Sequence, residues 1–193
     1  MSNIALICGH PDGSPKRLCH ALATTYAEAA RAAGHTVTRF DIAKLDFDLL
    51  RTQTEFETGT PQPDILSAQQ AIRSAHHIVL IYPLWLGTMP ALLKGFVEHV
   101  FRPGFAFEYT GNKMPKKLLS GRSVRIVITM GMPAFAYRWF FFSHSLRSLE
   151  RNILKFAGLG PIRSTIFGGV EAASDDKRTQ WLAEMERLGK TAS

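Results

Sequence analysis

The stretch Ile78–Phe107 constrains the fold more than any other part of the sequence. It begins with the apolar run Ile78–Tyr82, which is typical of a strand buried on both faces. A break rich in proline and apolar residues follows at 83–90. Residues 91–101 then have the composition of a helix, which Pro103–Gly104 ends. Strand, loop and helix in this order make half of a βαβ unit, in which ligands bind beyond the carboxyl end of the strand.

The loop in this unit is unusual because apolar side chains occupy backbone that is expected to be exposed. Leu84, Trp85 and Leu86 follow Pro83 directly. Such a loop covers a flat apolar ligand, packs against a second subunit, or is itself buried and only closes the core. The composition of the loop leaves these three alternatives open.

The start of the chain has the same organisation. An apolar run at 4–8 leads into loop 9–17, and the periodicity predicts an amphipathic helix over 18–33 and a strand over 37–42. Loop 9–17 is rich in glycine, serine and proline. Because this loop precedes a helix N-terminus, its unpaired N–H groups and the helix dipole favour a phosphate group.

Four side chains, those of His10, Ser14, Lys16 and Arg17, add hydrogen-bond donors to this loop. The loop matches neither the Walker A pattern nor G-x-G-x-x-G, which disfavours an ATP site and a Rossmann-type dinucleotide site. The net charge of +7 describes either a solvated basic surface or one that attracts phosphorylated cofactors. Lys and Arg are scattered along the chain, which disfavours a nucleic-acid partner.

Five strand patterns alternate with helices along the chain, which indicates a doubly wound α/β sheet. Asp64 and Ser174 stand before two of the helices and are the predicted N-caps. The patterns not described above are strands over 123–129 and 162–168 and helices over 65–74, 139–156 and 175–190.

Two stretches are expected to be irregular. Residues 43–63 are polar and long for a connection in a compact domain, so they are interpreted as a lid or a dimer element. Residues 105–115 are aromatic and then rich in glycine and polar residues, which predicts a loop or short hairpin near the ligand edge of the sheet.

The length fits a single domain spanning residues 1–193. No apolar run reaches the roughly 18 residues that span a membrane, so no stable membrane insertion is expected. The N-terminus lacks a cleavable signal pattern, which predicts a cytoplasmic protein. Cys8 and Cys19 predict neither a disulfide framework nor a metal site.

Four ordered parts of the central stretch resemble one protein family. They are Pro83–Trp85, Met89–Pro90, Leu93–Gly95 and Pro103–Phe107. This pattern is similar to that of the NAD(P)H:quinone oxidoreductase family, flavodoxin-like proteins that include bacterial drug-activity modulators and ancillary reductases of potassium efflux systems. The resemblance implies a flavodoxin-like five-stranded parallel sheet with strand order 2-1-3-4-5.

The resemblance also implies a flavin cofactor, either FAD or FMN. Its phosphate would lie at 9–19 and its ring between the loops at 83–88 and 129–133. Arg17-Leu18-Cys19 stands where the family typically has Ser-Phe-Asn, and Arg17 is a charged replacement for those phosphate contacts. The candidate cofactor-binding residues are His10, Ser14, Arg17, Leu18, Cys19, Pro83, Leu84, Trp85, Leu86, Gly87, Thr129, Met130 and Gly131.

Some relatives carry a tyrosine and a histidine that assist hydride transfer. Tyr137 is the candidate catalytic residue here, although its spacing differs from that of those relatives, and His144 is expected to be an ordinary helix residue. Trp85, Phe135 and Tyr137 are expected to stack on flat substrates.

The implied reaction transfers hydride from NAD(P)H to the flavin and then two electrons to a quinone-like acceptor, with ping-pong kinetics. The aromatic turn Trp139–Phe142 predicts a subunit interface or pocket wall, in keeping with a homodimer. An alternative is a flavin-binding regulatory subunit of a membrane transporter, docked through that turn. A flavodoxin-like electron carrier is disfavoured because such carriers are usually acidic.

Overall fold

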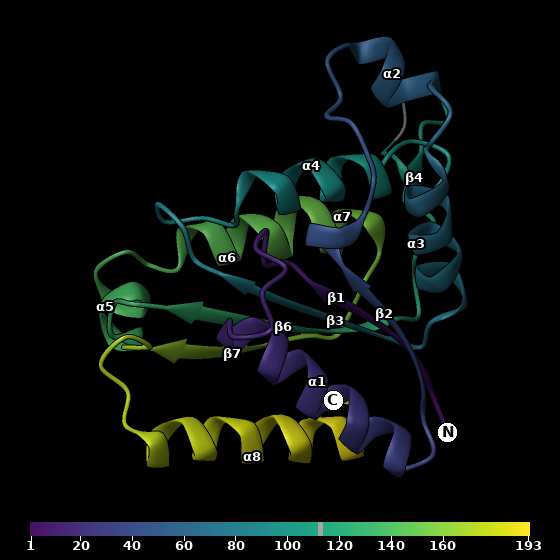
Figure 1. Ribbon diagram of the computed structural model, residues 1–193. Coiled ribbons are helices and arrows are strands. Elements are labelled where there is room, and N and C mark those ends of the chain that lie inside the picture. Colours follow the sequence, from purple (N-terminus) through teal and green to yellow (C-terminus); the bar gives the residue numbers. More distant parts are fainter. Residues whose placement is uncertain (112–113) are drawn as a thin grey trace.

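The computed structural model describes residues 1–111 and 114–193, in which five parallel strands form a central sheet (Figure 1). The sheet has the order β2-β1-β3-β6-β7, which is 2-1-3-4-5 when its own strands are counted in chain order, so the predicted flavodoxin-like sheet is confirmed. The strands are β1 (Asn3–Cys8), β2 (Thr36–Asp41), β3 (His77–Pro83), β6 (Ser123–Met130) and β7 (Ile162–Gly168).

Helices cover both faces of the sheet. In Figure 1, α1 (Leu18–Ala32) and α8 (Asp175–Thr191) lie side by side below it. Ser174 caps α8, since its hydroxyl accepts a hydrogen bond from Lys177 N–H, as predicted. The opposite face carries α3 (Pro63–Ser74), α4 (Ala91–Val100), α6 (His144–Ser148), the π-helical stretch η2 (Leu149–Leu154) and α7 (Lys155–Ala157).

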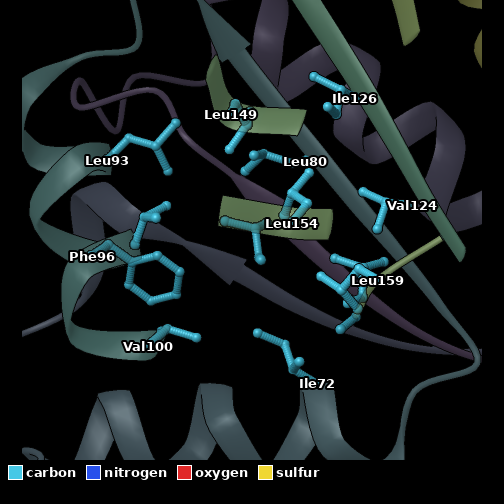
Figure 2. Close-up of a cluster of buried hydrophobic side chains, with 14 of the residues drawn as sticks. Ile72, Leu80, Leu93, Phe96, Val100, Val124, Ile126, Leu149, Leu154 and Leu159 are labelled. Carbon is cyan, nitrogen blue, oxygen red and sulfur yellow. The ribbon is translucent and has the colours of Figure 1, made fainter. Parts of the chain in front are cut away.

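The central strand β3 is buried along its whole length, as its continuous apolar run predicts. Alternate side chains therefore feed two cores. One core packs Leu80 and Ile126 against Leu93, Phe96 and neighbouring side chains of the helices above the sheet (Figure 2). The other packs the opposite faces of the same strands against α1 and α8.

The stretch 43–63 is more regular than predicted. Its first two residues belong to η1 (Ile42–Lys44), one turn of 3₁₀ helix. It also contains the short helix α2 (Gln53–Thr58), whose N-cap Thr52 accepts a hydrogen bond from Glu55 N–H. The prediction of Asp64 as an N-cap was wrong. Because Pro63 occupies the first turn, where its fixed φ is favourable, α3 begins two residues earlier than predicted, with Gln62 as its cap.

The single helix predicted over 139–156 is also wrong. Helix α5 (Ala134–Trp139) starts earlier, and the chain reverses at Phe142 and Ser143, whose φ values are 50° and 52°. Two bonds hold the reversal: Ser143 N–H donates to the Tyr137 carbonyl oxygen, and Leu146 N–H donates to the Tyr137 hydroxyl. These tertiary contacts override the helical composition of the segment.

Of the two alternatives predicted for 105–115, a loop or a short hairpin, the structure has the hairpin: β4 (Phe107–Glu108) pairs antiparallel with β5 (Lys116–Lys117), which begins just beyond that stretch. Residues 112–113 lie outside the described residues. The predicted place of the hairpin was wrong. The Arg73 guanidinium lies 5.2 Å from the centre of the Phe105 ring, at the end of α3 that precedes β3, so the hairpin lies away from the carboxyl ends of the strands (Figure 1). No helix among the described residues is long and apolar enough to cross a membrane.

Candidate active site

The parallel sheet brings three loops to the edge where its strands end. Gly9 N–H donates to the Ile81 carbonyl oxygen at 2.7 Å, which holds the loop after β1 against β3. Leu84 N–H donates to the Thr129 carbonyl oxygen at 2.8 Å, which holds the loop after β3 against β6. The loops that follow β1, β3 and β6 therefore lie next to one another.

Side chains join the same three segments. The His10 and Trp85 rings meet edge to face with their centres 5.8 Å apart. The Cys19 Sγ atom at the start of α1 lies 3.3 Å from the Thr129 hydroxyl at the end of β6. Residues predicted from three separate parts of the sequence are thus collected at one edge.

The loop 9–17 is organised around Asp12, a residue that the sequence reasoning missed. Its carboxylate accepts a hydrogen bond from Ser14 N–H at 2.8 Å and another from Arg17 Nε at 2.6 Å. These bonds hold the pKa of Asp12 below its usual value, with the bond from Ser14 as the larger cause. The chain's own carboxylate therefore engages two of the donors predicted to meet a phosphate.

Two histidines complete this loop. Asp12 N–H donates to His10 Nδ1 at 3.0 Å, and His20 Nε2 lies 2.8 Å from the Asp12 carbonyl oxygen. Burial, with His20 nearby, lowers the pKa of His10, so its imidazole is neutral near pH 7. His10 can then offer a hydrogen bond without adding a positive charge.

No side chain that the structure describes caps the backbone N–H groups at the N-terminus of α1. Arg17 is its N-cap but makes no capping bond through its side chain, and the first turn contains no acidic residue. The first N–H groups of a helix have no partner within it, so Leu18 and Cys19 contribute backbone donors and the positive end of a 15-residue helix. The Cys19 side chain itself is buried against Thr129.

Beside this loop opens a cavity of about 490 Å³ with charged walls. Arg39 and Lys44 contribute its positive charge, and both approach Asp41, at 2.8 and 3.7 Å. The Cys8, His20 and Asp41 ligand atoms lie within 4.8 Å of one another, a spacing that could hold a metal ion. Burial raises the pKa of the Cys8 thiol to about 11, and Arg39 already neutralises the carboxylate, so this group is an internally paired cluster.

The apolar loop after β3 is exposed, which excludes the alternative of a buried loop that only closes the core. Trp85 and Thr88 exchange backbone hydrogen bonds of 2.8 and 3.0 Å around a tight turn. Leu86 and Gly87 hold that turn with φ values of 46° and 80°, a conformation that glycine adopts without strain. Leu86 is fully exposed and Trp85 is 48% exposed, whereas Pro83 is buried.

The loop after β6 is held by the two residues that directly follow β7. Gly169 N–H bonds the Met132 carbonyl oxygen and Val170 N–H bonds that of Met130. The side chains of Thr129 and Met130 are buried, so among the three residues predicted here only Gly131 presents exposed backbone. Gly131 does not have a positive φ, and a Cβ there would meet Glu171 at 3.4 Å.

Tyr137 is placed differently from the prediction. Its ring is 2% exposed, and its hydroxyl lies 2.8 Å from Ser145 Oγ and accepts from Leu146 N–H. Stacking of Tyr137 on a substrate is excluded in this conformation because the ring is enclosed by the core. Phe135, by contrast, is 69% exposed, and Trp139 and the three phenylalanines after it form an exposed aromatic turn.

A larger cavity, of about 600 Å³, lies between α4, α7 and the segment 50–56. Aromatic side chains such as Phe56, Phe107 and Tyr109 line it, and none of the three loops contributes to its wall. The chemistry predicted for the loops therefore does not depend on this cavity.

A model of the family described as having the flavodoxin-like fold matches residues 2–189. The chain belongs to this flavodoxin-like family. It is 27% identical, over 91% of its length and 88% of the relative, to a Haemophilus influenzae protein named an uncharacterized NAD(P)H oxidoreductase. A shorter region, 39% of this chain and 38% of the relative, is 41% identical to a potassium-efflux system ancillary protein, KefG, of Serratia proteamaculans.

Solved structures with the same fold include an NAD(P)H:quinone oxidoreductase from Methanothermobacter marburgensis, with a TM-score of 0.82, 23% identity and 98% of each chain covered. An FMN-dependent NADH-azoreductase from Bacillus anthracis, solved with FMN, has a TM-score of 0.77 and 14% identity over 100% of this chain and 99% of that one. The predicted resemblance to NAD(P)H oxidoreductases and quinone reductases is thus confirmed for this flavodoxin-like chain.

Proposed function

We propose that the chain is an FMN-dependent NAD(P)H oxidoreductase that reduces quinone-like acceptors. The observation that carries this proposal is the meeting of the loops after β1, β3 and β6 at one edge of the sheet, through the Leu84–Thr129 and His10–Trp85 contacts. The names of the relatives, which combine NAD(P)H oxidation, quinone reduction and FMN, support the same chemistry.

The donors at this edge fit a flavin phosphate. The uncapped N-terminus of α1 offers the N–H groups of Leu18 and Cys19, and Arg17 and Ser14 lie beside it. Arg17 engages Asp12 through a single exposed bond, and its guanidinium can turn to a phosphate instead. The residues of this segment would hold the phosphate end of the cofactor.

The apolar residues at the same edge fit a flavin ring. Trp85 and Leu86 are held on a tight turn that keeps them out of the core, next to the neutral imidazole of His10. The backbone of Gly131 supplies an N–H group toward the pyrimidine end of such a ring, where negative charge develops on reduction. Bound FMN would accept two electrons from NAD(P)H and donate them to the acceptor.

One slot above these loops would serve both substrates in turn, so we expect ping-pong kinetics. Trp85 and Phe135 are both exposed and aromatic, and can stack on a nicotinamide or on a quinone. The catalytic role predicted for Tyr137 is not retained, because the buried hydroxyl is already bonded to Ser145 and Leu146.

The proposal is tested by denaturing the purified protein and measuring the mass of any released small molecule. FMN in the supernatant, with oxidation of NADH or NADPH that depends on added menadione, is the expected result. A parallel pattern of initial-rate lines across the two substrates checks the ping-pong order. Protein that neither retains nor takes up FMN would contradict the assignment.

We further propose that the chain acts as a homodimer through its exposed aromatic turn. Trp139, Phe140, Phe141 and Phe142 are 45–79% exposed on consecutive positions, more apolar surface than an isolated soluble protein normally presents. Light scattering after gel filtration should give twice the chain mass. Phe140→Ser should shift that mass toward the monomer.

A second candidate function is that of a flavin-binding regulatory subunit, docked on a membrane transporter through the same turn. It is favoured by the partial match to the potassium-efflux ancillary protein. Bound FMN without menadione-dependent turnover, together with a monomeric mass, would support this function over the enzyme.

A further inference from the structure

A group of charged and polar side chains lies at the opposite, amino-terminal end of the sheet. Val127 of β6 and Phe167 of β7 pack on the face covered by α1 and α8. Because alternate residues of a strand share a face, Arg125, Arg163 and Thr165 lie on that face too. This end of the sheet is separated from the three loops by the length of a strand, about 20 Å.

Two guanidinium groups are neighbours in this group. The register of β6 and β7 pairs Arg125 with Arg163. Arg125 is 7% exposed and makes one hydrogen bond, from Nη1 to the Thr165 hydroxyl at 3.3 Å. Burial, with Arg163 beside it, lowers the pKa of Arg125. Arg163 itself is exposed on an edge strand and can be reached from solvent.

Three buried atoms in this group have no hydrogen-bond partner in the described part of the chain. They are Arg125 Nε, the Tyr26 hydroxyl of α1 and His77 Nε2 of β3. Tyr26 is 0% exposed and His77 is 4% exposed. Charge interactions link the three groups, since Arg125 affects the pKa values of both Tyr26 and His77. Buried polar groups in folded proteins are nearly always paired, so these three groups point to a polar ligand that pairs with them.

The charge balance points to the same kind of ligand. Glu184 of α8 is the acidic side chain that faces Arg125, and its two oxygens already accept bonds of 2.9 and 2.7 Å from Arg187. The carboxylate is thereby engaged while the guanidinium groups of Arg125 and Arg163 remain positive. An added negative charge would offset that excess.

We propose that this cluster, defined as Tyr26, His77, Arg125, Arg163 and Thr165, is a binding site for a tetrahedral oxyanion of the phosphate class. Guanidinium groups match the geometry of phosphate oxygens, and the tyrosine hydroxyl and neutral imidazole supply further N–H or O–H donors. The phosphate is either free in solution or part of a lipid headgroup that reaches the cluster at the β7 edge.

Calorimetric titration with inorganic phosphate, at constant ionic strength set with chloride, tests the site. Excess FMN is present so that a phosphate site at loop 9–17 is filled, and the titration is repeated without FMN. We expect Arg163→Gln to weaken phosphate binding about tenfold, as the loss of a charged hydrogen bond does. Tyr26→Phe, which keeps the ring, should weaken it severalfold, whereas the exposed control Arg151→Gln should not.

A second arm measures co-sedimentation with phosphatidylglycerol vesicles. Vesicle binding that Arg163→Gln removes supports the same site with a headgroup as its ligand. The proposal is overturned if neither phosphate nor vesicles bind, or if Arg163→Gln and Tyr26→Phe bind as the unchanged chain does.

Discussion

The carboxyl edge of the sheet, where its strands end, and the amino edge, where they begin, differ in the kind of group that lacks a partner. At the carboxyl edge backbone hydrogen bonds join the loops after the strands, as Leu84 to Thr129 shows, while apolar side chains such as Leu86 are left exposed. At the amino edge the side chains are buried, while the polar atoms of Arg125 and Tyr26 are left without partners. Exposed apolar surface is stabilised by a flat ligand or a partner, whereas buried unpaired donors are stabilised by an anion.

This difference separates ligand recognition from stability. Substitutions of the exposed side chains at the carboxyl edge should change cofactor affinity with little effect on unfolding, because those side chains contribute little to the core. Substitutions at the amino edge should change stability. The edges lie about 20 Å apart, so their effects should add independently.

The largest effect tests the amino edge by pH. Burial, with Arg125 and Arg163 nearby, lowers the pKa of His77 to about 4. Below pH 6.5 the unfolded chain binds a proton at this residue and the folded chain does not. The contribution of His77 to the free energy of unfolding should therefore fall by about 3 kcal/mol as the pH drops from 6.5 to 4, and change no further below that.

Urea unfolding between pH 4 and 7.5 measures this slope, and His77→Gln should flatten it by the stated amount. The exposed His144→Gln serves as control and should keep the slope of the unchanged chain. If His77→Gln and His144→Gln give the same pH dependence, the charge at the amino edge is not the cause.

The sequence predicts the carboxyl edge better than the amino edge. An apolar run such as Ile78–Tyr82 marks a buried strand by itself, and each parallel strand delivers its following loop to the same edge. The pairing of Arg125 with Arg163 depends instead on the register of two strands joined by a long crossover. No local pattern contains that register.

Within the carboxyl edge, the errors come from contacts between segments. The break at Phe142 and the burial of Tyr137 arise because the Tyr137 hydroxyl bonds Ser145 and Leu146, which helical periodicity does not report. Asp12 was missed because a single acid in a glycine-rich loop has no distinctive spacing. The sequence does contain one signal: an Asp in a glycine-containing loop often accepts a hydrogen bond from the N–H two residues later, and Asp12 accepts from Ser14 in this way.

The next effect tests whether the bonded backbone at the carboxyl edge positions the site. A Cβ on Gly168 would lie 2.3 Å from Ala134 N and 2.7 Å from the Met132 carbonyl oxygen, both backbone atoms. Gly168→Ala should therefore push the loop after β6 away from β7, lower stability by about 2 kcal/mol and weaken FMN binding. Gly160→Ala, where a Cβ meets nothing within 4 Å, is the control.

Thermal unfolding and fluorescence titration with FMN give the two readouts for this pair. Weaker FMN binding in Gly168→Ala alone supports the positioning role. Full FMN affinity in a destabilised Gly168→Ala would show that the loop after β6 does not shape the site.

A smaller effect tests the exposed apolar surface. Trp85→Ala removes an aromatic ring that is 48% exposed, so stability should change little, while the dissociation constant of FMN should rise about tenfold. Trp139 is also exposed but lies outside the three loops. Trp139→Ala should therefore leave FMN affinity unchanged and shift the mass measured by light scattering from the dimer toward the monomer. Equal effects of the two substitutions on FMN binding would remove the distinction between ring site and interface.

The smallest effect concerns Asp12, where the carboxyl edge resembles the amino edge most closely. Its carboxylate bonds Arg17 directly, whereas the carboxylate that faces Arg125, that of Glu184, bonds Arg187 instead. Asp12→Asn keeps an oxygen that accepts from Ser14 N–H but removes the charge, so Arg17 is free to meet a phosphate. FMN should bind a few times more tightly, and this gain in affinity should be larger at low salt, where charges are screened less. Arg17→Gln should have the opposite effect. If Asp12→Asn instead weakens FMN binding in titrations at two salt concentrations, the carboxylate orders the loop for the cofactor rather than competing with it.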